Sequence, residues 1–270
     1  MDRRPIGVFD SGLGGLTAVR ELSRLLPAED IIYFGDTGRV PYGSRSRETI
    51  IKYARQDVAF LRTFDLKSIL IACGTVSTTA LEVLSAENSI PIMGVVAPAA
   101  AAAAEASRSG RIGLIGTQAS IRTGAYERAI TAVRPEAEVM ARACPLFVPL
   151  VENGRFRPGD RVAELVTEEY LEPFKTAGVD VLVLGCTHYP LLSQVIGAYM
   201  GPEVTLINTG AACADRMAAE LGEGNALTDK RAGEHRYYVS DSVDDFSRLA
   251  ATFLGEDLAG SVEQVDITGY

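Results

Sequence analysis

Two cysteines lie at the ends of short apolar runs, and each is followed by a threonine within two residues. Cys73 is followed by Thr75 at the second position, and Cys186 is followed directly by Thr187. A thiolate is both a base and a nucleophile, and open α/β proteins bind ligands at the carboxyl ends of their parallel strands. Two thiols at matching strand ends can flank one carbon atom, so the pair predicts chemistry at that carbon.

The two cysteines differ in their immediate surroundings. Cys73 precedes residues 74–79, which are rich in hydroxyls and are predicted to begin a helix, where unpaired N–H groups should lower the thiol pKa. Cys186 lies two residues before His188, whose imidazole can exchange a proton near neutral pH. The alternative is that both cysteines are small buried hydrophobes; their shared context favours the reactive interpretation. Cys144 and Cys213 lack that context and are predicted to be structural.

A glycine-rich turn and two loops offer polar groups for a ligand. Asp10 and Ser11 begin a turn with three glycines up to residue 15, whose N–H groups can approach an anion. The turn lacks the full dinucleotide or P-loop pattern, so an ordinary tight turn is the alternative. Residues 41–44 and the pair Thr117 and Ser120 supply further donors, which turn and cap chemistry would also explain.

Other charged residues have simpler interpretations. Glu152 lies in a largely apolar run and either orients His188 or begins a solvated turn. His235 is predicted to be exposed on an edge strand. Arg39, Arg45 and Arg47 are predicted to lie on a solvated face.

Apolar runs alternate with amphipathic stretches, which is typical of βαβ units. The predicted strands are 6–9, 31–34, 68–72, 92–95, 112–115, 179–184, 204–207 and 237–240, and helices are predicted at 99–104 and 243–254. Residues 6–11 resemble residues 112–117, and each precedes one of the two cysteines by a similar interval. The predicted fold is therefore α/β, with two similar open, mostly parallel-sheet domains facing each other across a cleft. The expected bounds are 1–97 plus 208–270 for the first domain and 98–207 for the second.

Composition and charge exclude several classes of protein. The 270 residues are 47% hydrophobic and 23% charged, as in ordinary globular proteins. A net charge of −9 without a basic cluster argues against a nucleic-acid partner. No apolar stretch is long enough to span a bilayer, so we expect no membrane association and a cytoplasmic location. Two histidines make a metal site improbable, and the four lysines offer no evident pyridoxal-phosphate anchor, so no cofactor is expected.

Six sequence blocks, spread in order along the chain, resemble the glutamate racemases of the aspartate/glutamate racemase superfamily. The blocks are GVFDSGLGGLT (7–17), YFGDTGRVPYG (33–43), IACGTVS (71–77), IGT (115–117), VPLVENG (148–154) and LGCTHYPLL (184–192). The resemblance implies cofactor-independent interconversion of L-glutamate and D-glutamate, which supplies peptidoglycan synthesis and thereby cell-wall biogenesis and cell shape. It also implies a homodimer.

The resemblance also implies roles for particular residues. Cys73 and Cys186 would be the two catalytic bases, assisted by Asp10 and His188, with Glu152 supporting His188. The implied substrate-binding residues are Asp10, Ser11, Pro41, Tyr42, Gly43, Ser44, Gly74, Thr75, Thr117, Ser120, Thr187 and His188.

One position departs from the family pattern, because Gly74 stands where the family commonly has Asn. A side-chain amide that could bind substrate is thereby lost. An aspartate or other amino-acid racemase of the same superfamily remains an alternative, since opposed thiols suit any amino-acid Cα. A regulator that binds an amino acid or a protein partner is the alternative from another class. Some family members are associated with inhibition of DNA gyrase, of which this sequence carries no indication.

Overall fold

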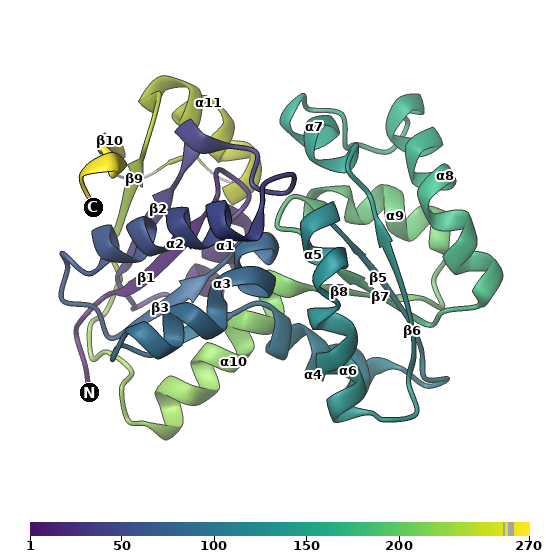
Figure 1. The fold of residues 1–270 in the computed structure, drawn as a ribbon, viewed down its shortest axis with the longest axis horizontal. Helices are drawn as coiled ribbons and strands as arrows, with labels where there is room; N and C mark the ends of the chain where they lie inside the picture. Colours follow the sequence, from purple (N-terminus) through teal and green to yellow (C-terminus); the bar gives the residue numbers. More distant parts are fainter. Residues whose placement is uncertain (256, 259–261) are drawn as a thin grey trace.

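Two parallel sheets form the framework of the chain, for which a computed structural model describes residues 1–255, 257–258 and 262–270. Within these residues the first sheet has six strands in the order β10-β9-β2-β1-β3-β4, and the second has four in the order β6-β5-β7-β8. Each strand pair is parallel. Figure 1 shows the sheets side by side, each flanked by helices, with both chain termini beside the first sheet. The predicted α/β class with two open parallel sheets is confirmed.

The described residues form the following elements. The strands are β1 (Ile6–Asp10), β2 (Ile31–Gly35), β3 (Ser68–Ile71), β4 (Ile92–Gly94), β5 (Arg111–Gly116), β6 (Glu138–Ala143), β7 (Val181–Leu184), β8 (Thr205–Asn208), β9 (His235–Val239) and β10 (Val262–Gln264). The α-helices are α1 (Leu16–Leu25), α2 (Arg47–Leu61), α3 (Gly74–Glu87), α4 (Val96–Ala106), α5 (Gln118–Thr123), α6 (Ala125–Val133), α7 (Phe147–Glu152), α8 (Arg161–Ala177), α9 (Ser193–Met200), α10 (Thr209–Glu223) and α11 (Val243–Leu254). Short 3-10 helices are η1 (Thr37–Arg39), η2 (Tyr189–Leu192) and η3 (Ile267–Gly269).

Burial explains why the apolar runs form central strands. Each residue of β1, β2, β3 and β7 is buried, as parallel strands covered by helices on both faces must be. The helices bury one side only: α1 buries Leu16, Val19 and Leu22, which recur at helical spacing. Ser46 fixes the start of α2 by accepting a hydrogen bond from the N–H of Thr49.

The two sheets repeat one strand order. The order β2-β1-β3-β4 in the first sheet matches β6-β5-β7-β8 in the second. Thus β1 corresponds to β5 and β3 corresponds to β7, in agreement with the sequence similarity between residues 6–11 and 112–117. Cys73 and Cys186 follow β3 and β7, so they stand after equivalent strands.

The sequence prediction missed two strands and misplaced one. Strands β6 and β10 were not predicted, because neither is a continuous apolar run: both lie at the edges of their sheets, with half-buried or exposed residues throughout. Strand β10 pairs with β9, so β9 is not an edge strand. The prediction of an exposed His235 is also wrong, because the residue is half-buried and its Nε2 lies 3.4 Å from Ser23 Oγ on α1.

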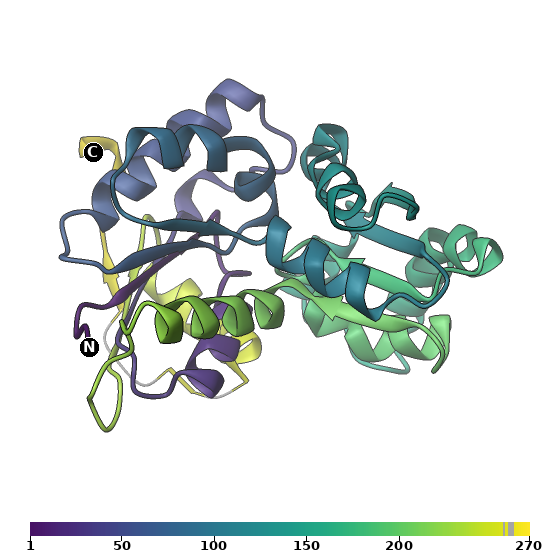
Figure 2. The same cartoon turned by 90° about the horizontal axis from the view of Figure 1, so that it is seen from below.

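The division into domains follows the sheets. The first sheet draws on residues 6–94 and 235–264, and the second on residues 111–208. Helix α10 then leads back and packs on α1 and α4, as Figure 2 shows from below. On this basis we propose the domain bounds 1–97 plus 208–270 and 98–207. Within the described residues, no helix combines the length and the apolar character needed to cross a membrane.

Candidate active site

The ends of β3 and β7 bring the two cysteines to one cavity of about 610 Å³. Cys73 precedes the first residue of α3, and Cys186 lies between β7 and η2. Both side chains are buried, with 5% and 6% exposure, and both line the cavity. The cavity is lined from both halves of the chain, so a ligand inside it would lie between two thiols.

The predicted effect of the helix start on Cys73 is wrong. Burial and the negative charge of Asp10 raise the pKa of the Cys73 thiol to about 12. A hydrogen bond to Ser11, whose Oγ lies 3.4 Å from Sγ, and the N–H groups of Val76 and Ser11 oppose this rise without cancelling it. The helix N-terminus is present, but desolvation outweighs it in a site this closed. Cys73 is therefore a protonated thiol at neutral pH.

Cys186 has a histidine partner. Its Sγ lies 3.9 Å from His188 Nδ1, and His188 Nε2 lies 3.1 Å from Glu152 Oε1. Burial would lower the pKa of His188, but the contacts with Cys186 and Glu152 prevail and raise it to about 10. The imidazole is thus protonated at neutral pH and places a positive charge beside the second thiol.

Glu152 is the last residue of α7, directly before the turn at residues 153–154; its side chain is 42% exposed, and its Oε1 faces His188 Nε2. The ring of Phe253 contacts His188 edge-on, with 5.2 Å between centroids. Helix α7 and the aromatic contact therefore fix the imidazole from two directions.

Asp10 lies beneath the cavity rather than on its wall. It is 1% exposed and is absent from the cavity lining. Burial raises the pKa of its carboxyl group, although the nearby His188 charge and the N–H groups of Gly15 and Gly12 oppose the rise. The N–H of Gly12 donates to Asp10 Oδ2 at 3.0 Å. The glycine turn therefore directs these N–H groups at its own carboxylate, in contrast to the expected external anion.

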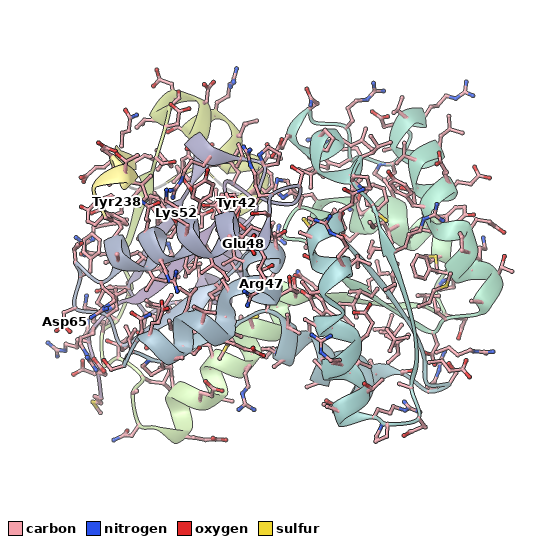
Figure 3. The ribbon with its side chains drawn as sticks, viewed as in Figure 1. Tyr42, Arg47, Glu48, Lys52, Asp65 and Tyr238 are labelled. Atoms are coloured by element: carbon pink, nitrogen blue, oxygen red, sulfur yellow. The ribbon has the colours of Figure 1, made fainter. Side chains whose placement is uncertain are left out.

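The loop before α2 reaches the cavity with its backbone. Tyr42 lines the cavity, but its hydroxyl donates to Asp36 and lies 3.4 Å from Asp57. Figure 3 shows Tyr42 near the first turn of α2. Arg39 bridges the same two carboxylates, at 2.6 Å and 2.9 Å, so the prediction that it lies on a solvated face is wrong.

Direct contacts join the halves around the cavity. Thr75 Oγ1 and Thr117 Oγ1 are 2.9 Å apart, and the N–H of Ala119 donates to the carbonyl of Gly43 at 3.2 Å. On the other side, Thr17 Oγ1 donates to the carbonyl of Thr187 at 2.9 Å. The two sides of the cavity are therefore joined by hydrogen bonds between segments that are far apart in sequence.

The structure brings most of the predicted residues to the cavity. Those that line it are Ser11, Pro41, Tyr42, Gly43, Ser44, Cys73, Gly74, Thr75, Thr117, Glu152, Cys186, Thr187 and His188. Ser120 does not line it: the side chain is fully buried, and its Oγ lies 3.0 Å from Thr117 Oγ1, so it positions Thr117. Cys144 and Cys213 are buried and do not line the cavity.

Sequence reasoning missed one wall of the cavity. It is formed at and after the turn into α11, by Asp241, Ser242, Asp245, Phe246 and Leu249. Helix α11 was predicted from its apolar spacing, but its place beside the cavity depends on its packing against α1 and β10, and no local signal marks it.

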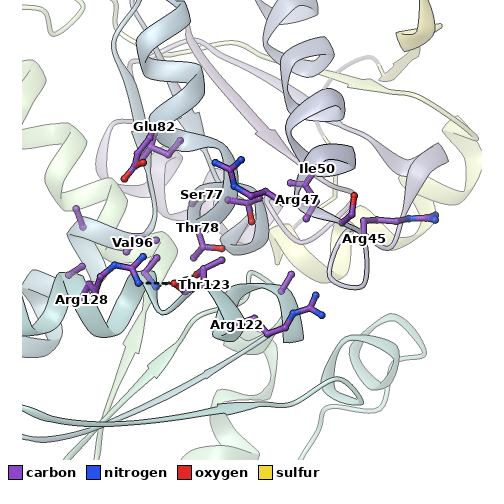
Figure 4. A pocket seen from close by; sticks show the side chains of 17 residues that line it. Arg45, Arg47, Ile50, Ser77, Thr78, Glu82, Val96, Arg122, Thr123 and Arg128 are labelled. Carbon is purple, nitrogen blue, oxygen red and sulfur yellow. Dashed lines mark hydrogen bonds between the residues drawn. The ribbon is translucent and has the colours of Figure 1, made fainter.

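A second, larger cavity of about 860 Å³ lies outside the thiol cleft, between α2 and α3 on one side and α5 and α6 on the other. Figure 4 shows its arginines, Arg45, Arg47, Arg122 and Arg128. Neither thiol lines it, so the smaller cavity is the candidate active site. Within the described part of the chain, no group of three or more His, Cys, Asp or Glu side chains is placed so that it could hold a metal ion.

Comparisons with known proteins agree with this geometry. The model of the Asp/Glu/Hydantoin racemase family matches residues 6–217. A glutamate racemase of Geobacter metallireducens is 48% identical over 269 residues, which cover 99% of this chain and 98% of that protein. A glutamate racemase of Streptococcus gordonii is 45% identical over 269 residues, which cover 99% of this chain and 100% of that protein.

Solved structures show the same architecture. The glutamate racemase isoform RacE1 of Bacillus anthracis superimposes with a TM-score of 0.93 at 36% identity, over 98% of this chain and 99% of that one. The glutamate racemase of Francisella tularensis, crystallised in complex with D-glutamate, gives a TM-score of 0.92 at 37% identity over the full length of both chains.

Proposed function

The chain belongs to the Asp/Glu/hydantoin racemase family, and from that premise we propose that it interconverts L-glutamate and D-glutamate with Cys73 and Cys186 as the two acid–base groups. The observation that carries the proposal is the pair of buried thiols, one from each half, that line one cavity. The glutamate complex of the Francisella tularensis relative supports the choice of substrate. Aspartate is the alternative substrate, and an activity assay with both amino acids distinguishes the two.

The reaction is a proton exchange at Cα. The thiolate on one face takes the Cα proton, and the Cα–H bond pair stays on carbon as a carbanion. The thiol on the opposite face then delivers its proton to that pair, which inverts the configuration and leaves the two sulfurs with exchanged protonation states. Because base and acid stand on opposite sides, each turnover reverses the stereochemistry.

The two thiols have different surroundings. The raised pKa of Cys73 keeps its proton in place, whereas Cys186 lies beside the positively charged His188. We therefore assign the resting acid to Cys73, with Cys186 as its partner on the other side of the cavity. Asp10 holds the proton near Cys73, and Glu152 keeps the charge on His188.

The carbanion requires stabilisation because a thiolate is a weak base for a Cα proton. Cys73 provides no side-chain cap to α3, and Gly74 and Thr75, whose N–H groups begin that helix at the positive end of its dipole, line the cavity. We assign these groups to the substrate α-carboxylate, where they can stabilise the developing charge.

Serine substitution tests the assignment of the thiols. Cys73→Ser and Cys186→Ser should each lower racemisation by at least about a hundredfold, measured by circular dichroism with L-glutamate, D-glutamate and L-aspartate. In deuterated water, each variant should still exchange the Cα proton of one enantiomer only for deuterium, because one thiol remains.

Cys213→Ser is the matched control, since this cysteine is buried but does not line the cavity; it should keep the activity of the wild type. Wild-type racemisation rates in both cavity variants would refute the two-thiol mechanism, and activity on aspartate alone would refute the substrate.

The remaining expectations stay predictions. Supply of D-glutamate to peptidoglycan and a homodimer follow from the family resemblance, and a cytoplasmic location is the expectation drawn from the lack of a long apolar stretch in the sequence.

A further inference from the structure

Thr17 joins the start of α1 to the segment that carries His188. Its side chain is 1% exposed, and its hydroxyl donates to the carbonyl oxygen of Gly14 at 2.8 Å and to that of Thr187 at 2.9 Å. One hydroxyl hydrogen is thus shared between a carbonyl of the first half and a carbonyl of the second. The side chain of Thr17 therefore ties the glycine turn after β1 to the residues after β7.

The carbonyl of Thr187 depends on this donor because of the residues that follow it. A 3-10 turn would supply the N–H of the third residue onward, but residue 190 is proline and has no N–H. The next N–H, that of Leu191, donates to the carbonyl of His188 at 3.2 Å. Loss of the Thr17 hydroxyl would therefore remove from a buried carbonyl the donor that holds residues 187–188 to α1.

Gly14 contacts the same segment at the imidazole. A Cβ on Gly14 would stand 2.2 Å from Thr187 Oγ1, 2.6 Å from His188 Nδ1 and 2.7 Å from His188 Cε1. Nδ1 is the ring atom that faces Cys186 Sγ at 3.9 Å. Gly14 does not have a positive φ, so these contacts, and not its backbone conformation, require glycine here.

Other elements hold the imidazole on its remaining sides. Glu152 of α7 lies 3.1 Å from Nε2, and the ring of Phe253 on α11 contacts the imidazole edge-on. A shift of residues 187–188 relative to α1 would therefore change the contacts of His188 with several elements at once.

We propose that Gly14 and Thr17 are positioning residues that hold His188 against α1 and thereby keep its Nδ1 at the thiol of Cys186. Neither residue lines the cavity, so both act through His188. The glycine turn that begins at Asp10, beside the first thiol, thus also fixes the surroundings of the second.

The first kinetic test compares two substitutions of Thr17. Thr17→Val removes the hydroxyl and keeps the shape, and it should lower kcat by about tenfold with a smaller change in KM. The estimate lies below the roughly hundredfold loss that a displacement of about 1 Å can cause, because only one tether is lost. Thr17→Ser keeps the hydroxyl and should recover most of the kcat.

Thr167→Val is the matched control for this change. Thr167 is fully buried in α8 and does not line the cavity, and its hydroxyl has no hydrogen-bond partner among the residues that the structure describes. The control therefore removes a buried hydroxyl without removing a tether, and it should keep the kcat and the Tm of the wild type.

The second kinetic test places a methyl group against the imidazole. Gly14→Ala should displace the ring by about 1 Å, the difference between the present spacing and an ordinary van der Waals contact, and lower kcat by about a hundredfold. Gly197→Ala is its control, because a Cβ on Gly197 in α9 would stand 3.7 Å from Leu206 Cδ1. If Gly14→Ala fails to fold, the threonine variants decide.

Nuclear magnetic resonance of the histidine rings provides a readout that needs no activity, since the chain has only two histidines. Burial lowers the pKa of His188, but the contacts with Cys186 and Glu152 raise it to about 10. Thr17→Val and Gly14→Ala should lower this pKa by about 1, because those contacts lengthen while the ring stays buried. Thr17→Ser and both controls should keep it, and His235 on β9 should keep its signals in every variant.

The kinetic measurements rest on the proposed function, and the resonance measurement does not. If the wild type fails to racemise glutamate, the proposed function fails and the pKa of His188 alone decides on Gly14 and Thr17. Wild-type kcat in Thr17→Val would overturn the inference, as would equal losses in Thr17→Val and Thr17→Ser. A lowered kcat with an unchanged pKa of His188 would also overturn it, because the two residues would then act on something other than His188.

Discussion

The surroundings of the two thiols show how burial changes the chemistry of a residue. Cys73 and Asp10 are both buried, and each disfavours a second negative charge nearby. Cys186 instead faces the protonated imidazole of His188. Similar sequence contexts thus place a protonated thiol on one side of the cavity and, on the other, a thiol beside a positive charge.

At the residue scale, Asp10 allows a test of how burial changes the free-energy cost of a charged group. Burial raises its pKa in the folded protein above the unfolded value of 3.8, so the ionised carboxylate costs stability as pH rises above 3.8. Asp10→Asn should therefore raise the free energy of unfolding at pH 8, and the gain should shrink as pH falls toward 4, where the unfolded carboxyl group also binds a proton. Urea unfolding across this pH range measures the effect.

The same variant should lose kcat by roughly a hundredfold, because the group that holds the proton near Cys73 becomes neutral. Lower stability of Asp10→Asn at each pH would contradict the assignment of Asp10 as a costly buried charge.

At the scale of elements, strand ends carry the reacting groups, and short neighbouring elements hold them. Helix α7 directs Glu152 at His188, and the loop before α2 is held by Tyr42 and Arg39 on the carboxylates of Asp36 and Asp57. Burial and the Asp36 charge raise the pKa of Asp57 far above its usual range, although Arg39 opposes this. The loop position therefore depends on two donors to two buried carboxyl groups.

Tyr42→Phe tests whether the Tyr42 hydroxyl holds the loop before α2 in place. Removal of one donor to a buried charged group should lower the free energy of unfolding by about 2 kcal/mol, measured by urea denaturation. KM for glutamate should rise, because the backbone of residues 42–44 lines the cavity. Tyr53→Phe, on the neighbouring ring 5.3 Å away, is a control that leaves both carboxyl groups with their partners. Equal stability of the two variants would show that the hydroxyl of Tyr42 does not hold the loop.

At the scale of the whole molecule, the site exists only where two equivalent half-structures meet. Each half places its third strand beside its first, and each contributes one cysteine. The contacts of Thr75 with Thr117 and of Thr17 with Thr187 close the cavity from two sides. A ligand in the cavity should therefore bind both halves at once.

Binding of D-glutamate should stabilise the molecule as one unit. At a ligand concentration of 100 times Kd, the free energy of unfolding should rise by about 2.7 kcal/mol. Hydrogen exchange should slow in the peptides around both Cys73 and Cys186, since the ligand lies between them. Slower exchange in only one half would show that the ligand does not bridge the cavity.

The sequence by itself determined the strands of both central cores and the two cysteines at their ends, because apolar runs and their period are local properties. The similarity of residues 6–11 to residues 112–117 predicted two similar halves. Because β2 follows β1 and pairs with it in the first half, the same similarity could have predicted a strand after β5, which is β6. The same local patterns predicted α11 but gave no indication of what it packs against.

Only the tertiary structure decided the charge states and the fit of the halves. The thiol pKa of Cys73, the role of Arg39 and the placement of α11 on the cavity depend on desolvation and contacts between residues far apart in the chain. The contact of Gly14 with His188 is of the same kind, since a glycine in a sequence does not reveal which residue will lie against it. Local sequence patterns select secondary structure, whereas electrostatics and close packing depend on distances that arise only when the chain has folded.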